Sequence, residues 1–378
     1  MKFLHTSDWH LGKKIEGRDR IAEQRAVLEE IITIAESEKV DVVLVAGDVF
    51  DTFVPPSEAE ELFYDITSRL ASNNRKVVII SGNHDDAFRL SAPNPFAEKM
   101  GIYIVGGFET NFTTVKSGEG YVQIKKGEEE VFIGLLPYPN ESRLKEEVNK
   151  DEDFSDKMKR WLNVGLNNNV KNLPSILVGH FYTLGGEVSD SERPIDLGGA
   201  RSIDKNILPN CNYIALGHLH KRQTASKTKN AYYSGAILEY AFDEAGYEKS
   251  VNVFEIIDGV TQNLKQIPLI SGKKLVRLEA TGYENALSLL EGYKGCFIEL
   301  TVKLEHPLTD LQVKILKNEY PEVVSLNLVF SEVNQIIAES KKTLTDEQLF
   351  NGYYKAKYGN EPPEKLMQTF LEIINETD

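Results

Sequence analysis

The sequence predicts an α/β fold in which parallel strands alternate with helices. Short β-branched and apolar runs stop abruptly at glycine or serine, which is typical of fully buried strands in a parallel sheet. The clearest is the run VVLVA, which ends at Gly47-Asp48. Segments with helical spacing of apolar residues separate the first three of these runs. This order indicates βαβ units with right-handed crossovers.

The first 100 residues supply three such strands and two helices. The predicted strands are residues 2–6, 41–46 and 76–80. Residues 18–38 carry a helical pattern, and a second helix begins at Ser57, which we expect to cap it ahead of an acidic first turn. Each strand ends in polar side chains, and ligands bind at that edge of open α/β sheets.

The pattern changes after residue 100. Between residues 102 and 136, short alternating segments separated by glycines favour antiparallel strands. Further buried strands are predicted within 175–180 and 213–220, each again ending in Gly-His. Residues 232–237 and 250–257 are expected to be strands that close a second sheet.

The chain is predicted to divide into three parts, residues 1–268, 269–335 and 343–378. The middle part reads as strand–helix–strand–helix–strand, a small α/β domain without a catalytic-looking cluster. The last part contains two amphipathic helices that cannot bury their apolar faces in each other completely. Those faces either fold back on the small domain or dock on a partner. They consist of Leu349, Phe350, Tyr353 and Tyr354 on the first helix and Leu366, Met367, Phe370 and Leu371 on the second.

The composition excludes several classes of protein. The chain has 378 residues, of which 41% are hydrophobic and 27% charged, so we expect a globular protein of two or three domains. Two isolated cysteines exclude a disulfide scaffold and fit a reducing cytosol. The opening residues do not resemble a signal peptide, and no apolar run is long enough to span a membrane.

The formal net charge of −15 by itself argues against a nucleic-acid partner, because phosphate binding usually requires a basic surface. The argument is weak for a metal enzyme, since bound dications add positive charge at the site itself. Basic residues also follow the first and last polar motifs, and they are either substrate-binding groups or a solvated face. They are Lys13, Lys14, Arg18, Lys221 and Arg222.

Five short motifs combine a strand end with side chains that can bind metal. Five of the seven histidines lie in them. A single Gly-His is more often a buried core histidine, but five such motifs in series would each need a separate coincidence. The motifs are Asp8-Trp9-His10, Gly47-Asp48, Gly82-Asn83-His84-Asp85, Gly179-His180 and Gly217-His218-Leu219-His220.

The donor set indicates the kind of metal. It mixes carboxylate, imidazole and amide oxygen without thiolate, which favours Mn²⁺, Mg²⁺ or Fe²⁺ over a closed structural zinc site. Two sets of donors imply two ions, and we expect Asp48 to bridge them at roughly 3.5–4 Å. Such a pair activates water for in-line attack at phosphorus. His5 lies inside the first strand and is interpreted as structural or supporting, and His306 as incidental.

In this order, the motifs resemble those of the calcineurin-like metallophosphoesterases. The segments HTSDWHLGK, GDVFD, SDSERP and ALGHLHK are most similar to the bacterial nuclease subunits of that family, and the likeness runs essentially the full length. The resemblance implies a four-layer sandwich of two mixed β-sheets flanked by helices. It also implies a small α/β capping domain and a C-terminal helix-loop-helix.

The resemblance further implies roles for individual residues. One metal would be held by Asp8, His10, Asp48 and His220, and the other by Asp48, Asn83, His180 and His218. His84 would be the catalytic residue that stabilises the transition state or protonates the leaving oxygen, a role that suits a side chain titrating near working pH.

The activity implied by the resemblance is Mn²⁺-dependent hydrolysis of DNA, with two ions per chain and Mg²⁺ as the alternative. The substrates would be duplex ends and hairpins, in DNA repair, recombination and replication near the nucleoid. The protein would form a homodimer through residues 55–100, and residues 343–378 would dock on the coiled-coil base of an SMC-like ATPase. A phosphomonoesterase or cyclic-nucleotide phosphodiesterase, and a non-catalytic DNA tether, remain as alternatives.

Overall fold

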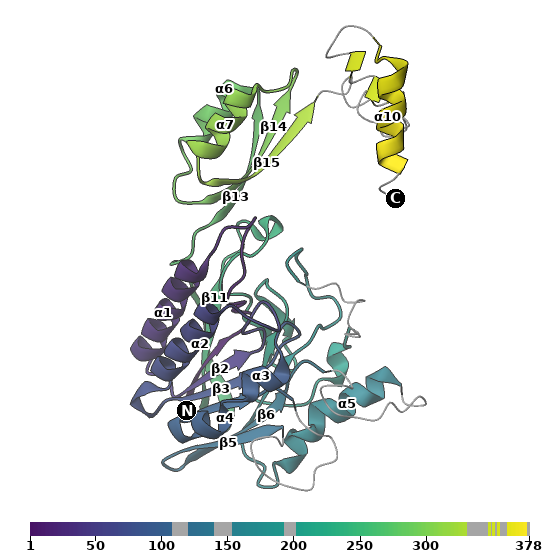
Figure 1. Ribbon diagram of the computed structural model, residues 1–378. Helices are drawn as coiled ribbons and strands as arrows, with labels where there is room; N and C mark the ends of the chain where they lie inside the picture. Colours follow the sequence, from purple (N-terminus) through teal and green to yellow (C-terminus); the bar gives the residue numbers. More distant parts are fainter. Residues whose placement is uncertain are drawn as a thin grey trace. The chain divides into compact units, whose positions relative to one another are not determined.

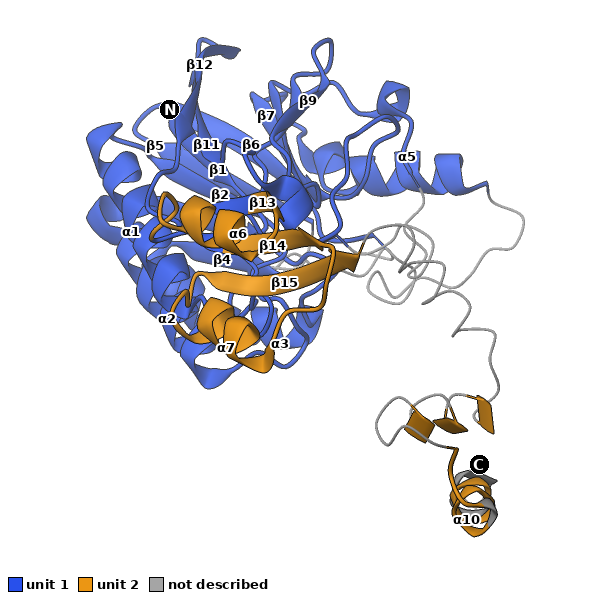
Figure 2. Ribbon diagram, turned by 90° about the horizontal axis from the view of Figure 1, so that it is seen from above, with its two compact units in different colours: residues 1–276, 295–297 blue, residues 277–294, 298–378 orange. Residues whose placement is uncertain are grey.

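The computed structural model contains two compact units. One comprises residues 1–276 and 295–297, and the other residues 277–294 and 298–378 (Figure 2). The residues that the structure describes are 1–107, 120–139, 153–192, 202–330, 347–348, 350–351, 354–355 and 361–375.

The first unit is built on two six-stranded mixed sheets. The first sheet has the order β12-β11-β1-β2-β3-β4, with β1 to β4 parallel to one another and β11 antiparallel to β1. Its strands are β1 Lys2–Thr6, β2 Val42–Ala46, β3 Lys76–Ile80, β4 Ile102–Val105, β11 Ser250–Ile257 and β12 Val260–Pro268. The crossovers run through α1 (Ile21–Ser37) and α2 (Ser57–Leu70), which lie along one face of this sheet (Figure 1).

The second sheet has the order β5-β6-β7-β8-β10-β9, with parallel strands in the middle and antiparallel strands at both edges. Its strands are β5 Tyr121–Lys126, β6 Glu129–Leu136, β7 Ser175–His180, β8 Tyr213–Gly217, β9 Gln223–Ser226 and β10 Ala231–Tyr233. Helix α5 (Phe154–Val164) buries Met158, Trp161 and Leu162 in the same core as this sheet.

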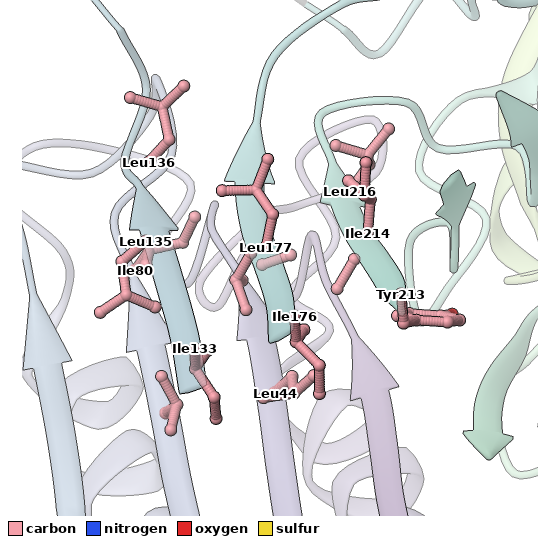
Figure 3. Close-up of a cluster of buried hydrophobic side chains, with 14 of the residues drawn as sticks. Leu44, Ile80, Ile133, Leu135, Leu136, Ile176, Leu177, Tyr213, Ile214 and Leu216 are labelled. Atoms are coloured by element: carbon pink, nitrogen blue, oxygen red, sulfur yellow. The ribbon is translucent and has the colours of Figure 1, made fainter. Parts of the chain in front are cut away.

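Successive side chains of each strand point to opposite faces of the sheet, and this alternation separates the core into two layers. In β2, Leu44 faces the second sheet, whereas Val43 and Val45 belong to the cluster that includes α1 and α2. Figure 3 shows Leu44 and Ile80 of the first sheet meeting residues of the second. The unit is therefore a sandwich of helices, sheet, sheet and helix, as the resemblance implied.

Shorter helices complete the unit. They are α3 Ala87–Ser91, α4 Asn94–Ala97 and the 3₁₀ turns Ser72–Asn74, Glu98–Met100, Leu166–Asn168, Lys205–Ile207 and Phe242–Glu244. No helix among the described residues is both long and apolar enough to cross a membrane.

The second unit contains a three-stranded sheet of order β13-β14-β15, and β14 is parallel to β15. Its elements are β13 Leu275–Thr281, α6 Tyr283–Leu290, β14 Phe297–Leu304, α7 Asp310–Asn318 and β15 Val323–Phe330, of which the first two residues of β13 and the first of β14 are counted with the first unit. This is the predicted strand–helix repeat, and Thr309 and Gln312 form a capping box at the start of α7.

Helix α10 (Glu364–Asn375) is the second predicted helix of the C-terminal part. The ring of Phe350 stacks on Phe370, with centroids 4.0 Å apart, so the two predicted apolar faces meet at this point. Leu366 is 42% exposed. Leu349 and Tyr353 lie outside the described residues. That residues 343–378 form a part distinct from residues 269–335 stays a prediction.

Three local predictions were wrong. Residues 102–105 form β4, parallel to β3, because the chain crosses back through α3 and α4. Of the described residues between 102 and 136, those of β5 and β6 form the expected antiparallel pair, whereas residues 108–119 lie outside the described part of the chain. Residues 250–257 form β11, which extends the first sheet beside β1 rather than closing the second. Ser57 does not cap α2, since Pro56 occupies the cap position with extended backbone and Ser57 is the first helical residue.

Candidate dinuclear metal site

The five predicted motifs meet at one edge of the sandwich. Three follow β1, β2 and β3 of the first sheet, and two lie at the ends of β7 and β8 of the second. Backbone bonds join the first two loops, because the amide of Asp8 donates to Gly47 O and that of His10 to Asp48 O, both at 3.0 Å. The seven predicted metal ligands and the predicted catalytic residue His84 are all buried. The ligands are Asp8, His10, Asp48, Asn83, His180, His218 and His220.

Three groups of these residues bring ligand atoms within 4.8 Å of one another. The groups are Asp8–His10–His220, Asp8–Asp48–His180 and His10–Asp48–His84. The first contains three of the four residues predicted for one metal. The second joins Asp48 and His180, predicted for the other metal, and adds Asp8.

Asp48 lies between the two predicted sets. Its Oδ2 atom is 3.6 Å from His10 Nε2 and 3.4 Å from His180 Nε2. Its Oδ1 atom accepts the backbone N–H of His84 at 2.8 Å. One carboxylate oxygen thus faces an imidazole from each set, which suits a bridging ligand.

The amide oxygen of Asn83 completes the second set. Asn83 Oδ1 is 2.9 Å from both His180 Nε2 and His218 Nδ1. These contacts join a strand end of the first sheet to two strand ends of the second. Oxygen and imidazole donors at such short mutual distances fit a divalent cation.

Backbone contacts orient two of the imidazoles. His180 Nδ1 lies 2.8 Å from Ala46 O, and His84 Nδ1 lies 2.8 Å from Asp51 O. A carbonyl oxygen can only accept, so each Nδ1 carries the proton. The Nε2 atom of each ring is then the atom that can bind a cation or exchange a proton.

In the loops after the strands, four of the predicted metal ligands have strained backbone conformations. Asp8, His10, Asp48 and His218 all have positive φ, at 52°, 44°, 49° and 98°. Such conformations cost of order 1–3 kcal/mol each and cluster at functional sites. Gln24 Nε2 donates to His10 O at 2.8 Å, and the Tyr240 hydroxyl donates to Trp9 O, so buried side chains hold the first loop in place.

Burial and close charges shift the pKa values in the site. Burial raises the pKa of Asp8 to about 6 and lowers that of His10 to about 3. Burial also opposes the charged form of His180, but the carboxylates of Asp48 and Asp8 outweigh it and raise its pKa to about 9. The carboxylates thus hold a proton on a histidine, and a bound divalent cation would replace that proton.

Several residues that support the site were not assigned roles from sequence. Asp85 accepts the backbone N–H groups of Val49, Phe50 and Gly82 at 3.1, 2.8 and 2.8 Å, which joins the loops after β2 and β3. Glu244 contacts His220 Nδ1 at 3.0 Å. Asp85 stands inside a recognised motif, whereas no sequence pattern marks Glu244.

The predicted substrate-binding cations differ in their placement. Lys13 Nζ lies 3.0 Å from Asp51 Oδ1 and so points toward the site. Lys221 pairs with Glu187 and Arg222 with Glu248, which neutralises both, whereas Lys14 and Arg18 are not buried. Their role in binding substrate stays a prediction.

The two remaining histidines lie apart from the donor groups. His5 Nδ1 is 3.1 Å from the Tyr213 hydroxyl, between the two sheets, which agrees with a structural role. His306 is exposed in the second unit, on the loop after β14.

Comparisons with known proteins place the chain in a family. Residues 1–222 match the family described as calcineurin-like phosphoesterase. The chain is 35% identical over 392 residues to the D subunit of the nuclease SbcCD from Bacillus subtilis strain 168, covering 99% of this chain and 98% of that protein.

Solved structures show weaker likeness. A dimetal phosphatase from Danio rerio is 13% identical with a TM-score of 0.43, covering 71% of this chain and 96% of its own. A hypothetical protein from Thermus thermophilus is 12% identical with a TM-score of 0.38, covering 71% and 98%.

Proposed function

The chain belongs to the calcineurin-like phosphoesterase family, and from that premise we propose that it is the nuclease subunit of an SbcCD-type complex, a metal-dependent phosphodiesterase that cuts DNA. The observation that carries the proposal is the position of Asp48. Its Oδ2 atom lies 3.6 Å from His10 Nε2 and 3.4 Å from His180 Nε2, between two sets of buried donors. A relative over 99% of the chain is named as a nuclease subunit, which supports DNA as the substrate.

The residues fit two divalent cations, with Asp48 as the shared ligand. Asp8, His10 and His220 would complete one set, and Asn83, His180 and His218 the other. Bound ions would supply an activated water and neutralise charge on the phosphate. The mixed oxygen and nitrogen donors favour Mn²⁺, with Mg²⁺ as the alternative.

His84 is the proposed catalytic residue. Its Nδ1 is occupied by Asp51 O at 2.8 Å, so the Nε2 atom is the one that can contact the scissile phosphate or the leaving oxygen. Its backbone N–H donates to Asp48 Oδ1 at 2.8 Å. This hydrogen bond fixes the backbone of the proposed catalytic histidine against the carboxylate of Asp48.

Substrate and partner assignments extend the proposal. We expect duplex ends and hairpins to be recognised by shape, since the sequence contains no base-reading motif. The SbcC ATPase would bind residues 343–378, and residues 269–335 would cap the nuclease domain of residues 1–268. Tyr64, Phe96 and Met100 are 48%, 75% and 57% exposed, which supports a homodimer contact in that region. We place the protein in the cytoplasm, near the nucleoid.

The deciding experiment compares wild type, His84→Ala and the exposed control His306→Ala on linear duplex and hairpin DNA. The assay contains the ATPase partner and either Mn²⁺ or Mg²⁺. We expect His84→Ala to lose roughly 10²–10⁴-fold in cutting rate while it keeps its metals, and His306→Ala to match wild type.

Other outcomes identify the alternatives. Turnover of small phosphomonoesters or cyclic nucleotides without DNA cutting would indicate a phosphatase or phosphodiesterase. DNA binding without any cutting would indicate a tether, and either result would contradict the nuclease proposal.

A further inference from the structure

A buried ion pair lies behind His220. Glu244 is fully buried and Lys249 is 7% exposed. Lys249 Nζ donates to Glu244 Oε2 at 2.5 Å, and Glu244 Oε1 lies 3.0 Å from His220 Nδ1. Because a buried ion pair is costly to build, its position against one predicted metal ligand calls for a functional reason.

Neighbouring side chains contact His220 at three places, its backbone N–H, its carbonyl oxygen and its Nδ1 atom. Its backbone N–H donates to Glu192 Oε1 at 2.6 Å, its carbonyl accepts from Lys249 Nζ at 3.2 Å, and its Nδ1 faces Glu244 Oε1. The hydroxyl of Ser191 donates to Glu244 and presents its oxygen to His220 Nδ1 at 2.5 Å. An acceptor-only carboxylate in this place requires the proton to be on Nδ1.

The opposite nitrogen of the ring faces the predicted metal position. His220 Nε2 lies 3.0 Å from His10 Nε2, in the group that also contains Asp8. A histidine with its proton on Nδ1 offers the Nε2 lone pair to a cation, whereas the other tautomer cannot. The hydrogen bond on Nδ1 thus decides whether Nε2 can bind metal.

We propose that Glu244, paired with Lys249, is a positioning residue that selects the Nδ1–H tautomer of His220 and so controls the affinity of the metal held with Asp8 and His10. The inference rests on the proposed function, in which His220 is a metal ligand. Groups that orient a metal-binding histidine typically change metal affinity by about 10–100-fold.

The substitution Glu244→Gln tests whether the group beside His220 Nδ1 selects its tautomer. Glu244 Oε2 faces two groups that can only donate, Lys249 Nζ at 2.5 Å and the backbone N–H of Tyr240 at 3.3 Å. The amide oxygen must take that place, so the NH₂ group turns toward His220 Nδ1. An N–H aimed at Nδ1 opposes a proton on that atom, although Ser191 Oγ, 2.5 Å from Nδ1, can still accept from it. The substitution therefore favours the tautomer of His220 with its proton on Nε2, where the metal would bind.

A second substitution should reverse the effect. With Lys249→Met added to Glu244→Gln, the ammonium group of Lys249 is gone and no longer holds the side-chain amide oxygen of Gln at position 244 toward residue 249. The amide can then rotate so that its oxygen accepts from His220 Nδ1, with loss of the longer contact to the Tyr240 N–H at 3.3 Å, which restores the metal-binding tautomer in part. The double variant also removes the charge that the single variant leaves unpaired, so it guards against simple misfolding.

The experiment measures Mn²⁺ affinity by calorimetry on the full-length chain, together with the thermal midpoint of the metal-free protein. Glu239→Gln is the matched control, because Glu239 is a nearby buried carboxylate that accepts the backbone N–H groups of Gly246 and Leu275. We expect two sites in wild type and in the control. We expect one site weakened about 10–100-fold in Glu244→Gln and partly recovered in the double variant.

The outcomes separate this inference from the proposed function. Wild type without Mn²⁺ binding would contradict the proposed metal centre. If wild type binds two ions and Glu244→Gln does so with equal affinity, the positioning role is wrong while the nuclease proposal stands. A double variant no tighter than the single variant would also overturn the tautomer explanation.

Discussion

The Nε2 atoms of His10 and His220 lie 3.0 Å apart, although 210 positions separate the two residues in the chain. His10 follows β1 of the first sheet, and His220 follows β8 of the second. Two imidazole nitrogens at this distance can share a hydrogen bond, and both would be ligands if a cation were bound. The pair marks the place where the carboxyl edges of the two sheets meet, and the predictions below concern that place and the residues that support it.

Asp48→Ala should remove both metals together, because Asp48 Oδ2 faces His10 and His180 at 3.6 and 3.4 Å. His10→Ala and His180→Ala should each weaken mainly one ion. Metal content per chain, measured after dialysis against limiting Mn²⁺, tests this. An Asp48→Ala protein that retains two ions and full activity would refute the bridging role.

Asp85→Ala should destabilise the fold. The change leaves three buried backbone N–H groups without their acceptor, those of Val49, Phe50 and Gly82. Each such group costs about 1–3 kcal/mol, so we expect a loss of about 3 kcal/mol or more in the free energy of unfolding, measured by urea denaturation with chelator present.

The neighbouring Asp86 is the control for Asp85. It also accepts two backbone N–H groups, from Phe88 and Arg89, but at the exposed start of α3. Asp86→Ala should therefore cost only about 1 kcal/mol, as the loss of a helix cap does. Equal losses in the two variants would show that the buried position of Asp85 is unimportant.

His5 should make the fold sensitive to acid. Burial lowers its pKa to about 3, below the ordinary value of 6.5, so the unfolded chain binds more protons between these two values. Its contribution to stability is present above pH 6.5 and is lost as the pH falls toward 3. The slope from this one group is at most about 1.4 kcal/mol per pH unit.

Urea denaturation between about pH 7 and pH 4 tests the role of His5. His5→Gln keeps a polar partner for the Tyr213 hydroxyl but cannot take up a proton in this range. The free energy of unfolding should therefore fall less steeply in the variant than in wild type. Parallel curves for the two proteins would mean that His5 does not titrate on unfolding.

Residues 343–378 should be needed for the partner and not for the metal site. Deletion of this segment should abolish capture of the SbcC ATPase and leave Mn²⁺ content unchanged. Leu366 is 42% exposed on α10, and Leu366→Asp should weaken capture, while Lys365→Ala on the same exposed helix should not. Unchanged capture after the deletion would contradict the docking role.

Most of the strands and helices could be predicted from local patterns. Buried runs such as that before Gly47-Asp48 carry their own signal, because a strand covered on both faces must be apolar throughout. The sheet to which β11 belongs could not be predicted in the same way. Its residues suit either sheet, and only pairing with β1 places it in the first.

The same division holds for the site. The eight candidates could be named because each lies at the end of a strand or within four residues after it, and strand ends of parallel sheets gather at one edge. They are Asp8, His10, Asp48, Asn83, His84, His180, His218 and His220. Asp85 stood in the same motif, but the three backbone groups it holds come from two loops. Glu244 and Lys249 lie in a segment without periodicity, and their contacts with His220 depend on the tertiary fold that brings this segment to the loop after β8. Local order along the chain thus determines which side chains reach the edge, whereas hydrogen bonds between distant segments decide how each one is oriented.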